Sequence, residues 1–202
     1  MYKIIFNPGS RGNHGILIWN TVKNLLDKQN VEYLLYETTH AGHAEELVKE
    51  ITSDDKPHTF IVIGGDGTIN EVVNGLKNPS LATMGVIPSG SGNDFAKALN
   101  IPLNPEHALS QILDCEQTVH INYGETRLQN VYRRFLISCG CGFDSDVCAG
   151  VQTSSLKPLL NKLGMGKLIY TLVALKTIIT KSVFKATIKL DDDYIVSMDN
   201  IF

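Results

Sequence analysis

The stretch Thr59-Phe60-Ile61-Val62-Ile63-Gly64-Gly65-Asp66-Gly67-Thr68 decides the fold. It begins as an apolar run of the length of a strand, and consecutive glycines then end the run abruptly. Apolar residues next recur at helical spacing over Ile69–Leu76, which predicts a helix directly after the glycines. A buried strand, a glycine-rich loop and a helix in this order are typical of a parallel sheet covered by helices.

The same order recurs on both sides of this stretch. Further strands are predicted at Tyr2–Phe6, Val31–Tyr36 and Met84–Ile87, with amphipathic helices at Ile16–Lys28 and Ala44–Ile51. Residues 1–121 are therefore predicted to form an α/β domain of three layers, with a parallel sheet in the middle. Ligands of such sheets lie at the carboxyl ends of the strands, and every glycine-rich break in this region follows a strand.

After His120 the pattern changes to glycine-rich, strand-like pieces. We predict strands at Phe135–Ser138 and Gly140–Phe143, a helical section over Ser154–Lys181, a hairpin of Lys185–Leu190 with Tyr194–Ser197 joined through Asp191–Asp193, and a turn at Asp199–Asn200. Residues 122–202 are thus predicted to begin a second, β-rich domain of the sandwich type. So few strands would leave open sheet edges, and we therefore expect a truncated domain from a longer protein.

The composition excludes several classes of protein. With 43% hydrophobic and 19% charged residues the chain is not disordered, and a net charge of -3 argues against a strongly basic nucleic-acid binder. No signal peptide opens the chain, and the longest apolar-rich stretch, Leu168–Ile179, contains Lys176 and is shorter than the ~20 residues of a membrane span. The spacing of the four cysteines and of the histidines predicts no metal centre. We expect a cytoplasmic protein with reduced cysteines.

The strongest chemical signal is Gly64–Thr68, followed by Asn70 and Glu71. Phosphate binding needs closely approaching backbone amides and a helix N-terminus, which such a loop supplies. Asp66 adds a carboxylate that could act on a magnesium ion or on a hydroxyl proton, and Thr68 could cap the helix or bond a phosphate oxygen. A tight structural turn with a capped helix is the alternative for this loop taken alone.

Three other loops follow predicted strands: Asn7–Gly12, Thr38–Ala44 and Pro88–Ala96. Small residues in the first loop allow a nucleotide to approach the backbone, and Arg11 could pair with phosphate, although no Walker A sequence is present. The last loop offers small polar side chains, and Asp94 begins the next helical turn. Ordinary turns and capped helix starts are the alternatives for each loop alone.

Together these loops resemble the diacylglycerol kinase catalytic-domain family of lipid kinases, which includes the sphingosine and ceramide kinases. The matching segments are Asn7-Pro8 with Ser10, Gly42-His43-Ala44, Gly64–Thr68 with Glu71, Pro88–Ala96 and Gly140–Asp144. The Gly-Gly-Asp-Gly-Thr sequence is shared with NAD kinases and, more distantly, with phosphofructokinases, whose fold the resemblance implies for the first domain. The sequence Gly-Ser-Gly-Asn-Asp-Phe-Ala favours the lipid kinases.

The resemblance implies a Mg²⁺- and ATP-dependent lipid kinase that phosphorylates the hydroxyl of diacylglycerol or a similar lipid. The ATP-binding residues that it implies are Asn7, Pro8, Gly9, Ser10, Arg11, Thr38 (with Thr39 as its neighbouring alternative), Gly65, Asp66, Gly67, Thr68, Asn70, Glu71 and Ser91. Asp66 and Asp94 are implied as catalytic residues, and the general base is expected beyond residue 202. Arg11 and Ser91 depart from the family, which usually has glycine and threonine there. A NAD kinase-like small-molecule kinase and a non-catalytic nucleotide- or lipid-binding regulator stay open as alternatives.

The net charge hides an uneven distribution. Val147–Leu190 contains seven lysines and no acidic residue, for a charge of +7, whereas the other residues hold 11 basic and 21 acidic side chains, for a charge of -10. Lysines beside apolar residues at helical spacing are typical of helices on anionic membrane surfaces. We therefore expect peripheral membrane association and a lipid substrate met at the membrane. A helix packed on the second domain with solvated lysines is the alternative, and a homodimer also stays open.

Overall fold

The computed structural model describes residues 1–115, 118–128, 130–155, 166–180, 183–190 and 194–201. They form two compact units, Met1–Ser138 and Cys139–Phe202, and each is described by itself.

The first unit is built on a four-stranded sheet with the order β2-β1-β3-β4. Its strands are β1 (Tyr2–Phe6), β2 (Tyr33–Glu37), β3 (His58–Gly64) and β4 (Ala82–Pro88). All pairs are parallel, and the register places Phe6 beside both Glu37 and Ile63, and Gly64 beside Pro88. The four carboxyl ends therefore lie in one row, and the loop that follows each strand begins at the same edge.

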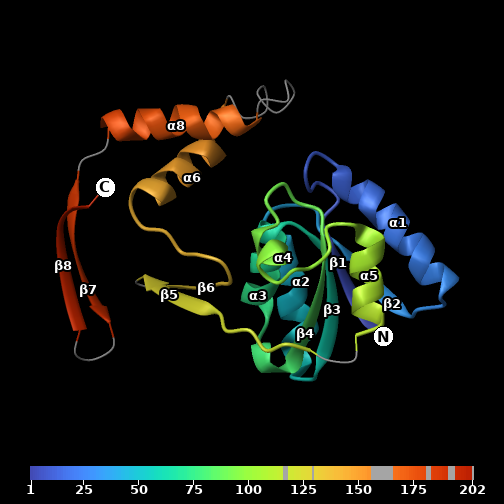
Figure 1. The fold of residues 1–202 in the computed structure, drawn as a ribbon. Coiled ribbons are helices and arrows are strands. Elements are labelled where there is room, and N and C mark those ends of the chain that lie inside the picture. The colour runs from blue at the N-terminus through green and yellow to red at the C-terminus, as the bar shows by residue number, and fades with distance from the viewer. Residues whose placement is uncertain (116–117, 129, 156–165, 181–182, 191–193, 202) are drawn as a thin grey trace. The chain divides into compact units, whose positions relative to one another are not determined.

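Helices cover both faces of this sheet (Figure 1). On one face lie α1 (His14–Lys28) and α5 (Pro105–Leu113), and on the other lie α2 (His43–Ile51) and α3 (Asp66–Gly75). Strand alternation separates two apolar cores: Ile4 packs with α1 and α5, whereas its neighbour Ile5 packs with α2 and α3. This confirms the predicted α/β domain with helices on both sides of a parallel sheet. The short elements α4 (Asp94–Ala98), η1 (Thr52–Asp54) and η2 (Pro79–Leu81) complete its helices.

The glycine-rich stretch is partly helical. Because apolar periodicity does not detect a polar first turn, the sequence predicts a helix from Ile69, whereas α3 begins at Asp66. Asp66, Gly67 and Thr68 are therefore residues of the first helical turn, directly after a loop that consists of Gly65.

An antiparallel hairpin of β5 (Gly124–Leu128) and β6 (Val131–Phe135) belongs to the first unit. Asn74 on α3 holds it: its Nδ2 donates to the Arg134 carbonyl over 3.0 Å, and its Oδ1 accepts from the Arg134 amide over 2.9 Å. The first unit therefore ends at Ser138, whereas the sequence places the boundary between residues 121 and 122. The predicted strand at Phe135–Ser138 is out of place, because β6 ends where that prediction begins.

The second unit contains α6 (Phe143–Thr153), α8 (Gly166–Thr180), β7 (Phe184–Leu190) and β8 (Tyr194–Ile201). The predicted hairpin is confirmed, since β7 and β8 pair antiparallel. The strand predicted at Gly140–Phe143 is wrong: Gly142 has a φ of 93°, and α6 begins at Phe143. The turn predicted at Asp199–Asn200 is also wrong, because both residues lie within β8.

Of the helical section predicted over Ser154–Lys181, α8 confirms the part from Gly166 to Thr180, whereas Ser154 and Ser155 are not helical. Residues 156–165 and 181 of that section, and Asp191–Asp193, lie outside the described residues. The sheet described here has two strands, so the sandwich stays a prediction. Within the described residues, no helix is long and apolar enough to cross a membrane.

Candidate functional site

The candidate site is the row of loops at the carboxyl edge of the first unit's sheet. Backbone hydrogen bonds continue the strands into these loops, from the Asn7 amide to the Ile63 carbonyl (3.0 Å), from Thr38 to Phe6 (2.8 Å) and from Ser89 to Gly64 (2.9 Å). The sheet thus sets the starting position of each loop.

Side chains of the first loop reach α3 and the loop after β4. Asn7 Nδ2 donates to Thr68 Oγ1 over 2.9 Å, and the hydroxyls of Ser10 and Ser89 lie 2.7 Å apart. The bond between Ser10 and Ser89 is buried and therefore shielded from water, and the bond between Asn7 and the buried Thr68 is partly buried. They fix the first loop against α3 and against the loop after β4.

The loops after β3 and β4 touch backbone to backbone. A Cβ atom built on Gly90 would lie 2.6 Å from Gly65 Cα, which leaves no room for a side chain. Asn93, in the left-handed conformation at a φ of 54°, accepts from the Gly90 amide over 2.9 Å and donates to the Gly90 carbonyl over 3.0 Å. This closes the loop after β4 tightly enough for it to lie directly on Gly65.

The Asp66 carboxylate caps α4. Its Oδ2 accepts from the Asp94 amide over 3.1 Å and its Oδ1 from the Phe95 amide over 3.0 Å. A carboxylate at a helix N-terminus satisfies amides that have no partner inside the helix. The sequence assigns Asp66 to ATP binding or catalysis, and the geometry shows that Asp66 also fixes the backbone of Asp94. The carboxylate of Asp94 itself is exposed and lies 3.3 Å from Lys97 Nζ.

The Glu71 carboxylate likewise accepts hydrogen bonds from backbone amides, here at the N-terminus of α2. Its two oxygens accept from the amides of Gly42 (2.9 Å) and Ala44 (3.2 Å), at the start of that helix. Glu71, predicted to bind ATP, is thus engaged by the loop after β2.

The N-terminus of α3 differs from those of α2 and α4. Its N-cap, Gly65, is extended and provides no side-chain hydrogen bond. The amides of Gly67 and Thr68 precede the first bond within the helix, which runs from the Ile69 amide to the Gly65 carbonyl (3.1 Å). Gly67 is exposed, and a Cβ atom on it would meet no atom within 4 Å. Open space therefore lies beside Gly67 in this first turn.

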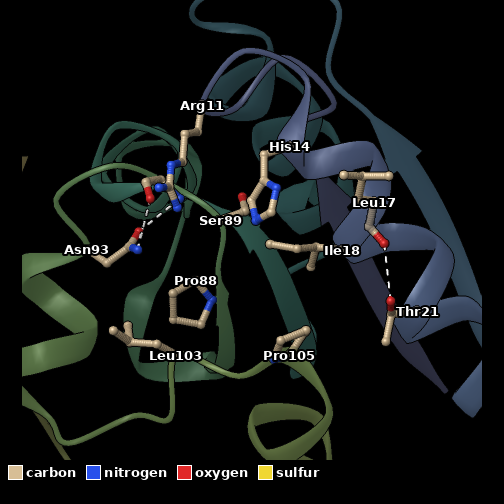
Figure 2. A pocket seen from close by; sticks show the side chains of 11 residues that line it. Arg11, His14, Leu17, Ile18, Thr21, Pro88, Ser89, Asn93, Leu103 and Pro105 are labelled. Atoms are coloured by element: carbon tan, nitrogen blue, oxygen red, sulfur yellow. Dashed lines mark hydrogen bonds between the residues drawn. The ribbon is translucent and has the colours of Figure 1, made fainter. Parts of the chain in front are cut away.

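The remaining predicted residues lie around this row with fewer contacts. Thr38 is buried beside β1, whereas the hydroxyl of its alternative, Thr39, is 3.0 Å from His40 Nδ1. Arg11 is exposed and extends from the first loop toward Asn93 (Figure 2). Ser91 is exposed in the loop after β4.

The first unit is similar in sequence to a known family of proteins. Residues 1–125 match the model of the diacylglycerol kinase catalytic domain. The chain belongs to this family. This family is one of kinases.

Relatives with this domain are longer than the chain. It is 30% identical over 196 residues to "Putative lipid kinase YtlR" of Bacillus subtilis (strain 168), covering 94% of this chain and 63% of that protein. It is 37% identical over 113 residues to a diacylglycerol kinase of Staphylococcus carnosus (strain TM300), covering 55% of this chain and 37% of that protein. A crystal structure of a diacylglycerol kinase from Bacillus anthracis str. Sterne has a TM-score of 0.48 at 28% identity, over 56% of this chain and 41% of that chain.

The structure adds residues that sequence reasoning did not assign to the family's site. A Cβ atom on Gly15 would lie 2.3 Å from the Asn7 carbonyl oxygen and 2.6 Å from Ser10 Oγ, so only glycine lets the first loop fold onto α1. Ser89 and Asn93 shape the loop after β4, as described above. The role of Gly15 could have been suspected from the sequence, because this glycine follows shortly after a glycine-rich loop. The contact between Ser10 and Ser89 could not, because the two residues are 79 positions apart.

Two carboxylates could take part in holding Mg²⁺. A Cβ atom on Gly92 would lie 3.1 Å from Asp66 Oδ2 and 3.4 Å from Asp94 Oδ2, so both carboxylates border the same small space. The described residues contain no group of three or more His, Cys, Asp and Glu placed to hold a metal. A pair of carboxylates nevertheless fits Mg²⁺, which proteins often bind through one or two carboxylates together with substrate phosphates.

Proposed function

We propose that this chain is the nucleotide-binding part of an ATP-dependent lipid kinase, and that the ATP phosphates bind at the N-terminus of α3. One observation carries the proposal. Of the helices α2, α3 and α4, all within the described residues, α2 and α4 have their N-terminal amides occupied by Glu71 and Asp66, and α3 does not. An uncapped helix N-terminus with a glycine beside it suits a phosphate.

The chain's residues would act mainly by positioning. Asn7, held on Thr68, places the first loop beside the phosphates, and Asp66 fixes α4 so that Asp94 stays at the same edge of the sheet. Phosphoryl transfer requires in-line placement and charge neutralisation rather than covalent catalysis, which suits such a scaffold. Mg²⁺ bound with the participation of Asp66 and Asp94 would neutralise charge on the phosphates. The base for the acceptor hydroxyl would lie beyond residue 202.

The phosphate position can be tested with an added carboxylate. Gly67→Asp puts a negative charge at the α3 N-terminus, where it favours the helix and repels phosphate. We expect ATP binding, measured by titration calorimetry, to weaken at least tenfold without loss of thermal stability. Asn20→Asp, on the exposed part of α1, adds the same charge away from the site and should leave ATP binding unchanged. Equal affinities of the two variants would contradict the proposal.

The acceptor needs a separate experiment. The whole reading frame would be supplied with radiolabelled ATP and either diacylglycerol, other neutral lipid alcohols or NAD. We expect labelled lipid, and we expect Asp94→Asn to retain ATP binding while transfer falls at least tenfold, because the exposed carboxylate borders the proposed metal position. Labelled NAD without labelled lipid would favour the small-molecule kinase, and ATP binding without any transfer would favour a regulator.

Peripheral membrane binding is proposed for the second unit. Exposed apolar side chains of α8 include Tyr170, Leu175 and Ile178, and Lys176 is exposed beside them. Lys157 and Lys162, which contribute to the basic charge of this region, lie outside the described residues.

Vesicle sedimentation would test this proposal with membranes rich in phosphatidylglycerol. Reversing Lys176 and Lys189 to Glu should reduce binding severalfold, since a basic residue near an anionic surface contributes ~1 kcal/mol. Reversing the exposed Lys23 of the first unit is the matched control. Unchanged binding after the α8 and β7 reversals would contradict a membrane role for these lysines. The homodimer and the lack of a nucleic-acid partner stay predictions.

A further inference from the structure

A pocket of about 280 Å³ lies in the first unit beneath the first loop and the loop after β4 (Figure 2). Four segments contribute to its wall: the first loop, the beginning of α1, the end of β4 with its loop, and the segment that leads into α5. The wall includes Arg11, His14, Leu17, Ile18, Ser89 and Leu103.

This pocket adjoins the proposed phosphate position, because Gly90 in its wall lies against Gly65 at the start of α3, and it extends from there along α1. Its walls come from the face of the sheet that α1 and α5 cover, whereas Glu71 and the start of α2 belong to the opposite face. Of the residues that the sequence assigns to ATP, the pocket contains Arg11. An occupant along α1 and Leu103 therefore extends away from the residues assigned to ATP and meets them at Arg11.

Most polar groups of the wall already have partners. The Thr21 hydroxyl donates to the Leu17 carbonyl over 3.2 Å, Ser89 is paired with Ser10, and the Gly90 backbone is paired with the Asn93 side chain. A ligand cannot take these groups without breaking existing hydrogen bonds. They form a polar but closed part of the wall.

Two side chains remain available. Within the described part of the chain, the Arg11 guanidinium and the His14 ring have no hydrogen-bond or ion-pair partner, and both line the pocket (Figure 2). The lining includes no Asp or Glu. A permanent cation and a ring nitrogen without a neighbouring carboxylate favour an acidic group on the ligand.

The rest of the pocket is apolar and open to solvent. Leu17 is 63% exposed and Leu103 is 54% exposed, although both face a concave surface that also includes Ile18. Leucines exposed around a pocket are stabilised when an apolar group covers them. This part of the pocket suits hydrocarbon rather than a sugar or a base with many polar atoms.

We propose that the pocket binds an anionic amphiphile, with its acid group at Arg11 and His14 and its hydrocarbon chain against Leu17 and Leu103. A carboxylate and a phosphate monoester share this chemistry, and the two sources are a free fatty acid and the acidic end of a lipid.

Titration calorimetry on the 202-residue chain tests the proposal with monomeric octanoate, octyl phosphate and octanol. Both acids, or one of them, should bind at least tenfold more tightly than the alcohol, and the tighter acid identifies the source. Arg11→Gln should remove the preference for the acid while leaving the weak binding of octanol unchanged. Octanol that binds as tightly as both acids would overturn the proposal.

A matched pair of variants on α1 separates the pocket from the general surface. Leu17→Glu places a carboxylate in the wall and should weaken binding of the preferred acid at least tenfold. Ile16→Glu, 42% exposed on the same helix but outside the lining, should leave it unchanged. A circular dichroism spectrum and a urea midpoint like those of the native chain verify that Leu17→Glu is folded, so this outcome does not depend on whether the chain binds ATP. Acid binding that survives Leu17→Glu unchanged would overturn the proposal.

Discussion

Gly90 is the residue at which the loops after β3 and β4 meet. Because a Cβ atom there would lie 2.6 Å from Gly65 Cα and 2.8 Å from Asn93 Oδ1, Gly90→Ala has to displace backbone. We expect it to lower the free energy of unfolding by about 1–3 kcal/mol, the usual cost of overpacking. Gly67→Ala, which meets open space in the first turn of α3, should instead stabilise by up to about 1 kcal/mol. Urea unfolding measures both, and equal stabilities would contradict the contact.

Asp54 gives a pH dependence that can be assigned to one residue. Its hydrogen bond with His58 Nε2 (2.8 Å), followed by that from the Lys56 amide, lowers the pKa of Asp54. A carboxyl whose folded pKa is lowered stabilises the fold above its unfolded pKa of about 3.9 and loses that contribution as the pH falls through the folded pKa. The stability difference between the native chain and Asp54→Asn should therefore narrow from pH 5 to pH 3. A constant difference in urea midpoints across this range would show that the ionised form contributes nothing.

Lys3 contacts His58 from the other side, and its charged form destabilises the fold, whereas the ionised form of Asp54 stabilises it. Desolvation by burial is the main cause that lowers the pKa of Lys3, partly offset by the charge of Asp54. A lysine whose folded pKa is lowered costs stability while it is charged, and that cost disappears as the pH rises through its folded pKa. Lys3→Met should therefore stabilise the chain at pH 7 and lose this advantage toward pH 10.5. An advantage that grows with pH would contradict the assignment.

The end of α3 is clamped by the β5–β6 hairpin. Arg134 Nη1 donates to the carbonyls of Val73 (3.0 Å) and Leu76 (2.6 Å), and Asn74 bonds both backbone groups of Arg134. Asn74→Ala leaves part-buried backbone groups without partners, and we expect a loss of about 1–3 kcal/mol. Hydrogen exchange should show the Arg134 amide losing protection first. The exposed Asn20→Ala is the control, and unchanged exchange at Arg134 would contradict the clamp.

A helix, strand or contact could be predicted from the sequence where the residues that determine it are close together in the chain. Three strands of the first sheet, β1, β3 and β4, are apolar runs that end at or close to glycine or proline, and the sequence predicts them well. That Asp66 caps α4 and Glu71 caps α2 could not be predicted, because it depends on which loop faces which across the sheet. At Gly140–Phe143 the local signal was misleading: Gly142 takes a positive φ, and Asp144 in the next turn favours a helix start.

The whole molecule consists of units with very different cores. The first unit has a core on each face of its sheet, whereas the described core of the second consists of Val147, Val151 and Ile169 with a few partly buried neighbours. An isolated hairpin such as β7–β8 is marginal in water, and a core of this size offsets little conformational entropy. We therefore expect residues 1–138 to fold alone and residues 139–202 not to.

Urea unfolding followed by circular dichroism would measure this difference for the two fragments. Residues 1–138 should unfold cooperatively and retain ATP binding within about threefold of the 202-residue chain, because all residues of the proposed phosphate position lie in that unit. A fragment of residues 1–121 lacks Arg134 and should be less stable than residues 1–138, since the C-terminal carbonyls of α3 then lose their donor. Cooperative unfolding of residues 139–202 alone, or equal stability of the two shorter N-terminal fragments, would contradict this division of the molecule. The hairpin thus belongs to the nucleotide-binding unit because it completes α3, the helix on which the phosphate position depends.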